Sequence, residues 1–145
     1  MASELKVDKF TGVTTAGSIL VTGEGNSTTT NLQQGLNKVW CHYDQNTDNV
    51  ARDSLNVGSL TDNGTGDMKI TFTNNMGNNF YSIVGTAEAA GYGSVVYVGS
   101  SGDPVNDATE MTTSLIEIQV RGSLNTTPAM ADPDAGMIQI AGDLA

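Results

Sequence analysis

Residues 55–73 read LNVGSLTDNGTGDMKITFT, and this stretch decides the fold class. Its second half alternates apolar and polar residues, which is the period of a strand with one buried face. Between the halves, Asp62 to Asp67 supplies turn residues, and Asn63-Gly64 is suited to positive φ. We therefore predict a β-hairpin. Its first strand is expected to hold Leu55, Val57 and Leu60, and its return strand to bury Met68, Ile70 and Phe72 while Lys69, Thr71 and Thr73 face solvent.

Two longer strands are predicted on either side of the hairpin from the same alternation. Lys38–Tyr43 is expected to place Val39, Cys41 and Tyr43 on one face and Trp40 and His42 on the other. Thr113–Arg121 is expected to point Ile116, Ile118 and Val120 inward and Glu117, Gln119 and Arg121 outward. Shorter strands are predicted over Ser3–Val7, Ser18–Thr22, Phe80–Val84, Gly93–Val98 and Met137–Ala141.

Turn-forming residues separate these strands. The predicted loops are Gly23–Thr30, Asn74–Asn79, Ala87–Gly91, Ser100–Asp107 and Asn125–Gly136, the last of which contains two prolines. The one helix candidate is Asn31–Lys38, where Leu32 and Leu36 would share a face. Gly35 interrupts it, so about two turns at most are expected.

The pattern of short strands without βαβ alternation defines the expected architecture. About seven or eight strands indicate an all-β, antiparallel sandwich or jelly-roll-like domain. We assign this domain to residues 31–145. Residues 1–30 hold few large apolar side chains, so we predict an extended N-terminal arm that anchors the protein or pairs with a neighbouring subunit.

The net charge of the chain disfavours two classes of binding partner. The chain of 145 residues carries 6 Lys plus Arg against 16 Asp plus Glu, a net charge of −10. This field repels nucleic-acid phosphates and anionic membrane surfaces, so neither is an expected partner. The N-terminus shows no apolar signal stretch, and no run approaches the roughly 20 apolar residues of a membrane helix.

Residues for catalysis are few. The single cysteine, Cys41, adjoins the single histidine, His42, and adjacent strand residues point to opposite faces. A Cys–His dyad is therefore excluded by the predicted strand. The Gly23-x-Gly25 and Gly91-x-Gly93 pairs do not continue into a dinucleotide or phosphate loop.

The carboxylates are scattered along turns and loops. They are Asp62 and Asp67 at the hairpin turn, Asp103, Asp107 and Glu110 in one loop, and Asp132 and Asp134 around Pro133. A glycosidase needs two acids facing each other across a cleft, about 5–10 Å apart. A calcium loop at Asp62–Asp67 would need oxygen ligands at its third and fifth positions, which are glycines. We predict no catalytic residue, no metal site and no cofactor, and hence no enzyme.

Three segments carry a resemblance to a known module. They are Leu36–Tyr43, Arg52–Thr73 and Phe80–Gly85, with the Arg-Asp-Ser-Leu-Asn-Val-Gly-Ser segment leading into the Thr-Asp-Asn-Gly-Thr-Gly-Asp hairpin. This order resembles a module of tail-fibre-like and other virion structural proteins of tailed phages, notably marine cyanophages. The segments Ser3–Asp8 and Val13–Ile19 are similar to the N-terminal leaders of such proteins, and Gly142–Ala145 to their usual ending.

The resemblance implies a non-enzymatic homotrimer, assembled in the host cytoplasm and exposed on the virion surface. The implied partners are the chain itself and other virion proteins of the capsid or tail. It leaves open whether the protein is a short tail-fibre-like appendage or a head-decoration protein.

An alternative function is a carbohydrate- or host-receptor-binding module that serves host attachment. Aromatic residues that could stack on a sugar are Trp40, Tyr43, Tyr81, Tyr92 and Tyr97, although aromatics on strands are more often core or interface residues.

Overall fold

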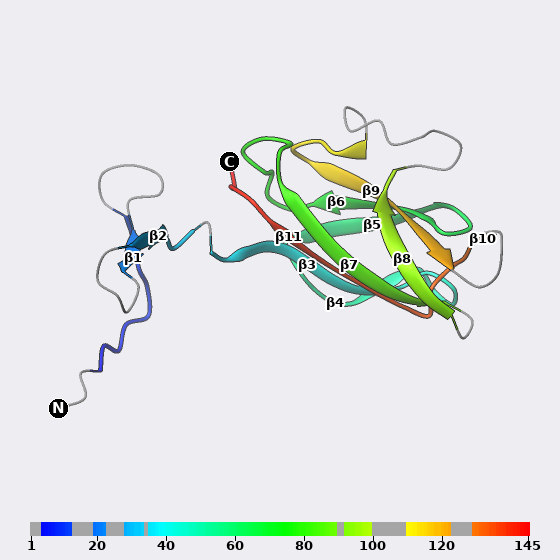
Figure 1. Cartoon of the computed structure of the whole chain (residues 1–145), viewed down its shortest axis with the longest axis horizontal. Helices are drawn as coiled ribbons and strands as arrows, with labels where there is room; N and C mark the ends of the chain where they lie inside the picture. The colour runs from blue at the N-terminus through cyan, green and yellow to red at the C-terminus, as the bar shows by residue number, and fades with distance from the viewer. Residues whose placement is uncertain are drawn as a thin grey trace. The chain divides into compact units, whose positions relative to one another are not determined.

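A computed structural model describes residues 4–12, 19–22, 28–33, 35–89, 92–99, 110–122 and 129–145 (Figure 1). The chain divides into two compact units, Met1–Leu36 and Asn37–Ala145. No helix in the described part of the chain is long and apolar enough to cross a membrane.

In the described residues of the first unit, two short strands form an antiparallel ladder. Strand β1 (Leu20–Thr22) pairs with β2 (Thr29–Asn31). The weak strand predicted over Ser3–Val7 is not formed in its described residues, 4–7, which have no regular structure.

The predicted helix over Asn31–Lys38 is wrong. Asn31 ends β2 and its side-chain oxygen accepts a hydrogen bond from the Gln33 backbone N–H at 2.8 Å, which forms a local turn. Leu32 donates its N–H to the Ile19 carbonyl, so this segment continues the hairpin pairing. The helix propensity of an eight-residue segment with two leucines and one glycine is too weak to compete with that pairing.

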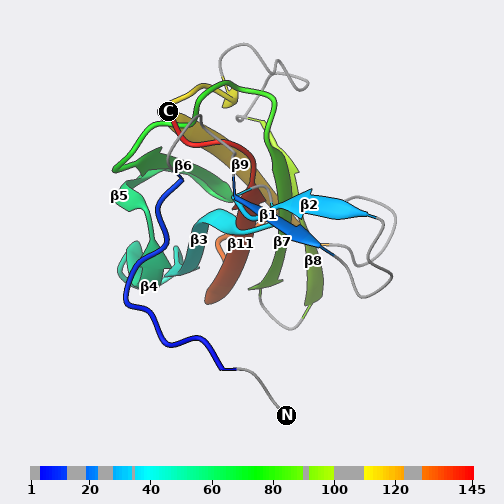
Figure 2. The same cartoon turned by 90° about the vertical axis from the view of Figure 1, so that its left-hand side faces the viewer.

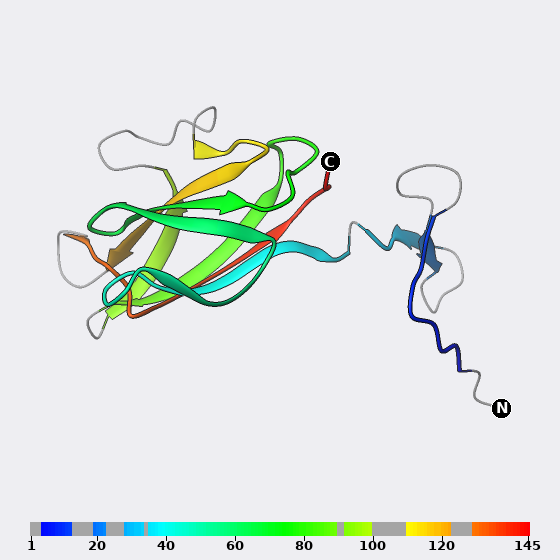
Figure 3. The same ribbon diagram turned by 180° about the vertical axis from the view of Figure 1, so that it is seen from behind.

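The second unit is an all-β antiparallel sandwich built from a nine-stranded sheet. Its strands are β3 (Asn37–Asp44), β4 (Val50–Leu55), β5 (Val57–Gly64), β6 (Asp67–Phe72), β7 (Ser82–Ala89), β8 (Tyr92–Val98), β9 (Leu115–Gly122), β10 (Ala129–Met130) and β11 (Ala135–Ala141). The sheet order is β4-β3-β11-β7-β8-β9-β6-β5, with β10 beside β9. The sheet folds over on itself, so that β5, β6 and β9 lie across from β3, β11 and β7 (Figures 2 and 3).

The core lies between these two layers and follows the predicted alternation. The inward residues predicted on β3, β6 and β9 are all buried, which confirms the facing of those strands. Gln119 was expected to face solvent. It does alternate away from the core, but only 4% of it is exposed, and its side-chain oxygen accepts a hydrogen bond from Arg121 at 2.9 Å.

The predicted hairpin is formed by β5 and β6, with two corrections. Leu55 belongs to a separate strand, β4, where it lies opposite Trp40 of β3. The break falls at Asn56, whose φ of 60° ends one strand and lets the next begin. Within the turn, positive φ falls on Gly64 and Gly66 rather than on Asn63.

Three further boundaries differ from the sequence expectation. β7 begins at Ser82 and runs through Ala89, so Phe80 stays outside it and is 87% exposed. β8 begins one residue before Gly93. The predicted loop Asn125–Gly136 contains β10 and the first residues of β11. The predicted loops Ser100–Asp107 and Gly23–Thr30 lie wholly or largely outside the described residues.

Tyr43 offers a test of the core. Its side chain is fully buried, and no described group forms a hydrogen bond with its hydroxyl. A buried hydroxyl without a partner carries a desolvation cost, so Tyr43→Phe is expected to stabilise the fold by about 1 kcal/mol. Urea unfolding of both proteins measures the difference. Tyr81→Phe is the control and should destabilise, because the Tyr81 hydroxyl donates to the Thr112 and Leu115 carbonyl oxygens at 3.1 and 3.0 Å.

Candidate interaction surface

The outer side of the layer formed by β4, β3, β11 and β7 exposes large apolar side chains. The pairing of neighbouring strands places four residues in one row, in the order Leu55, Trp40, Gln139 and Val84. A second row joins Asp53, His42, Met137 and Thr86 in the same way. We call Trp40, Leu55, Val84 and Met137 the apolar face.

The apolar face is open to solvent in the single chain. Leu55 is 47% exposed, Val84 66% and Met137 46%, while Trp40 is half-buried. A shallow hollow of about 310 Å³ lies over the β7–β11 pair and is lined by residues 84–86 and 137–139. Large exposed apolar side chains gathered on one outer surface, here with polar neighbours such as Gln139 between them, are typical of an interaction site.

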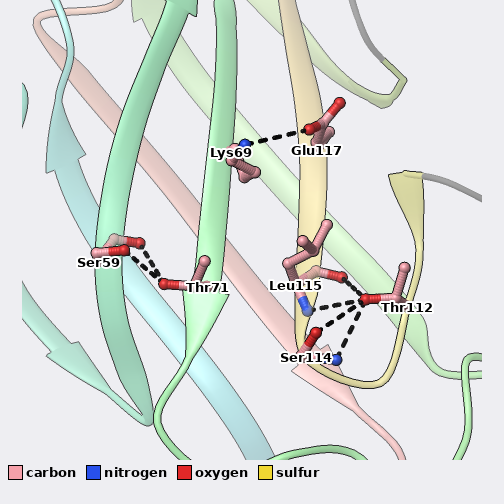
Figure 4. Close-up of polar contacts among 7 residues, drawn as sticks. All are labelled: Ser59, Lys69, Thr71, Thr112, Ser114, Leu115 and Glu117. Atoms are coloured by element: carbon pink, nitrogen blue, oxygen red, sulfur yellow. Dashed lines mark hydrogen bonds and ion pairs between the residues drawn. The ribbon is translucent and has the colours of Figure 1, made fainter.

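The outer side of the opposite layer is polar (Figure 4). On β5 and β6, the hydroxyls of Ser59 and Thr71 are hydrogen-bonded at 2.6 Å. On β6 and β9, the Lys69 ammonium lies 3.9 Å from a Glu117 carboxylate oxygen. We call these four residues the polar face. The two outer surfaces therefore differ in chemistry at these described residues: Leu55, Val84 and Met137 are exposed on one, and the Ser59–Thr71 and Lys69–Glu117 pairs lie on the other.

The catalytic candidates weighed from the sequence lie apart, as the strand alternation predicted. Cys41 is 1% exposed in the core, whereas His42 lies on the outer side of β3 beside Met137. Burial raises the pKa of the Cys41 thiol to about 11, so almost none of it is thiolate at neutral pH.

This burial predicts an inert thiol. In the native protein Cys41 is expected to react with iodoacetamide at least about a hundredfold more slowly than a free cysteine, because only the thiolate attacks. Mass spectrometry over a time course measures the rate. Addition of a denaturing concentration of guanidinium chloride is the control and should restore rapid labelling. Rapid labelling without denaturant would contradict the buried placement.

The carboxylates near the hairpin turn act as hydrogen-bond acceptors within the fold. Asp62 accepts from the Gly64 N–H at 2.9 Å, and Asp132 accepts from the Gly66 N–H at 2.5 Å. Asp134 accepts from the Asn46 side chain at 2.7 Å. The Gln45 side chain donates to Asp62 and to the Gly64 and Asp67 carbonyls, which ties the end of β3 to the hairpin.

Of the three acidic candidates in the loop before β9, the structure describes only Glu110. Glu110 is 3% exposed, and Asp103 and Asp107 lie outside the described residues. Within the described ranges, no group of three or more His, Cys, Asp or Glu side chains could hold a metal ion.

Asp44 is the carboxylate with the clearest electrostatic role. The Thr47 backbone N–H donates to one oxygen at 2.9 Å, and the Arg52 guanidinium forms an ion pair with the other. The Thr47 hydrogen bond first, and then Arg52, hold the pKa of Asp44 below its ordinary value of 3.8. A lowered folded-state pKa means that the ionised carboxylate stabilises the fold above pH 3.8, and that this stabilisation is lost as pH falls through the folded-state pKa.

Asp44→Asn is therefore expected to lower the free energy of unfolding at pH 7, and the difference from the unsubstituted protein should shrink below pH 3.8. Urea unfolding at about pH 7 and about pH 3 measures both values. Asp48→Asn, at an exposed neighbouring acid, is the matched control and should change little at either pH. An equal loss for Asp44→Asn at both pH values would refute the electrostatic role.

The apolar face was not predicted, yet the sequence contains a signal for it. Three neighbouring strands each hold two adjacent apolar residues: Val39-Trp40, Ile83-Val84 and Met137-Ile138. Because successive strand residues point to opposite sides, one member of each pair must face outward. The strand order β3-β11-β7 then brings the three outward members together.

Comparisons of the chain with protein-family models, with curated proteins and with solved structures found no match in any of the three.

Proposed function

We propose that this chain is a non-enzymatic structural component of a tailed-phage virion, exposed on the particle surface as a homotrimer. It is either a short tail-fibre-like appendage or a head-decoration protein. The starting point is the resemblance of residues 36–43, 52–73 and 80–85 to virion structural modules. In the fold most of these residues lie on β3, β4, β5, β6 and β7 of the sandwich.

The observation that carries the proposal is the difference between the two outer surfaces. A protein that packs against other subunits through one side and meets solvent through the other needs one apolar and one polar surface. The exposed Val84 and Met137 on one side, and the Ser59–Thr71 and Lys69–Glu117 pairs on the other, fit that requirement. The core position of Cys41 also fits a role without nucleophilic chemistry.

A protein partner suits the apolar face better than a sugar. Sugar recognition combines an open aromatic ring with polar groups that hydrogen-bond the hydroxyls. The Trp40 ring is half-buried, and the exposed side chains around it include the aliphatic residues Leu55, Val84 and Met137. At the apolar face, carbohydrate binding therefore has less support than packing against another protein chain.

Cryo-electron microscopy of purified virions tests the proposal. Density for the sandwich at the particle surface is expected, on a threefold axis. Quantitative mass spectrometry separates the two locations: on the order of tens of copies fit a tail appendage, and on the order of hundreds fit a head decoration. Particles that lack the chain altogether would overturn the virion role.

The N-terminal arm has its own test. Deletion of residues 1–30 is expected to abolish incorporation into particles, because the arm is proposed to provide anchoring or intersubunit pairing. Co-sedimentation of the shortened chain with particles is the measurement, and circular dichroism of the purified chain is the folding control. Normal incorporation of a folded, shortened chain would refute the role of the arm.

A further inference from the structure

Exposed apolar side chains occur on two separate parts of the chain. One part is the apolar face of the second unit. The other is the first unit, where large apolar side chains are about half to three-quarters exposed: Leu5 74%, Val7 47%, Phe10 61%, Leu20 58% and Val21 50%. Among the described residues of this unit, the three-residue ladder between β1 and β2 leaves all five of these side chains exposed.

Symmetry indicates how these two surfaces can be used. In a trimer with threefold symmetry, every interface joins two different surfaces of neighbouring copies. A flat patch that pairs with itself forms a dimer instead. The apolar face and the N-terminal unit are two different apolar surfaces on one chain, which is what a closed threefold ring requires.

Net charge distinguishes the two candidate occupants of the apolar face, which are the second unit of another copy and the N-terminal arm of another copy. Glu4, Asp8 and Glu24 are three of the 16 acidic residues, which leaves thirteen in residues 37–145 against the four basic residues Lys38, Arg52, Lys69 and Arg121. Two second units of this charge repel each other. Residues 4–10 are balanced, with Lys6 and Lys9 against Glu4 and Asp8, so the arm meets no such repulsion.

The dimensions also agree. The seven residues Glu4–Phe10 would span about 23 Å when fully extended, and four strands about 4.8 Å apart form a surface roughly 15 Å wide. An extended arm can therefore cross all four strands of the apolar face. It would place Leu5 and Val7 on one side of the extended chain, toward the face, and Lys6 on the other.

We propose that Glu4–Phe10 of one copy lies across the apolar face of a second copy, with Leu5 and Val7 covering Val84 and Met137. This contact rests on the homotrimer in the proposed function and makes it specific: the arm of each subunit covers the sandwich of the next. Three such contacts close the ring.

Disulfide trapping in the full-length protein tests the contact. Val7→Cys chains and Val84→Cys chains, carrying tags of different mass, are co-expressed and mildly oxidised. A disulfide-linked heterodimer of the two is expected on a non-reducing gel, and the native Cys41 stays unreactive because it is buried. Phe80→Cys replaces Val84→Cys in the matched control. Phe80 is 87% exposed but lies before β7 and is not one of the four residues of the apolar face, so its cross-linking yield should be at least about fivefold lower.

Other products would contradict the contact in recognisable ways. Homodimers of Val84→Cys chains would show that apolar faces pair with each other. Cross-linking only within a doubly substituted Val7→Cys/Val84→Cys chain would show that the arm folds back on its own sandwich. Light scattering measures the oligomeric state and so tests the arm contact and the homotrimer separately. A trimer without the Val7–Val84 cross-link refutes the arm contact alone, whereas a monomer refutes the homotrimer as well. Neither result affects detection of the chain in virions.

A substitution at the face provides an independent measurement. Val84→Asp places a charge under the arm and is expected to raise the dissociation constant of the trimer by about tenfold or more. Sedimentation equilibrium measures the constant. Phe80→Asp is the matched control and should leave it unchanged. Equal effects of the two substitutions would overturn the arm contact.

Discussion

Gly136→Ala is expected to lower the free energy of unfolding by at least about 3 kcal/mol, since overpacking a closed core commonly costs about 1–3 kcal/mol and more where nothing can move. Gly136 of β11 lies opposite Tyr43 of β3, and the tyrosine ring occupies the space that a side chain at Gly136 would take. A Cβ there would lie 2.1 Å from the Tyr43 Cζ atom and 2.5 Å from its Cε2 and hydroxyl oxygen. Tyr43 is completely buried, so its ring has no open space to enter.

Urea unfolding measures the loss, and two further variants identify its cause. Gly58→Ala is the matched control, because a Cβ at Gly58 would have no neighbour closer than 3.5 Å, which is ordinary contact. It should change stability little. Tyr43→Leu removes the ring, so combining it with Gly136→Ala should cost much less than the sum of the single losses. Additive losses would show that the ring is not what makes alanine unfavourable.

Strand positions and their facing were largely predictable from the sequence. On β3, β6 and β9 the inward-facing positions are those with the small or large apolar residues, and residue identity therefore indicates which side of each strand enters the core, although Lys38 and Gln119 are buried as well. The helix prediction failed because local propensity takes no account of a pairing partner, here Ile19, whose carbonyl accepts from Leu32, thirteen residues later. The placement of Leu55 failed because the two strands around it are separated by Asn56 alone.

The apolar face needed information that local patterns lack. Val84 and Met137 are 53 positions apart in the sequence and meet only because β7 pairs with β11. Adjacent apolar residues on a strand show that one of them faces outward, but the strand order decides whether several such residues gather. The absence of a usable Cys41–His42 pair, by contrast, followed from two neighbouring positions and the strand period.

Gly66→Ala is expected to cost about 3 kcal/mol, for reasons that also explain the pattern of the hairpin turn. Gly66 has a φ of 64°, which L-residues adopt at a cost. A Cβ there would lie 2.6 Å from the Val120 carbonyl oxygen and 2.8 Å from the Ala131 nitrogen. Both are backbone atoms in or next to strands, so no side-chain rotation can relieve the contact.

The two glycines of the turn therefore have different roles, and the comparison between them is the sharpest test. Gly64 has a φ of 138°, but a Cβ there would meet nothing within 4 Å. Gly64→Ala should thus show the cost of backbone strain alone, about 1–2 kcal/mol, and Gly66→Ala that cost plus the clash with β9 and residue 131. Equal losses in urea unfolding would mean that the close approach at Gly66 contributes nothing. A larger loss at Gly66 would show that close packing of the turn against β9 also disfavours alanine. Two hydrogen bonds hold Gly66 in this place: the Val120 N–H donates to its carbonyl at 2.8 Å, and Asp132 accepts from its N–H. The close approach to Val120 and Ala131 gives a physical reason for glycine at position 66 that requires no ligand.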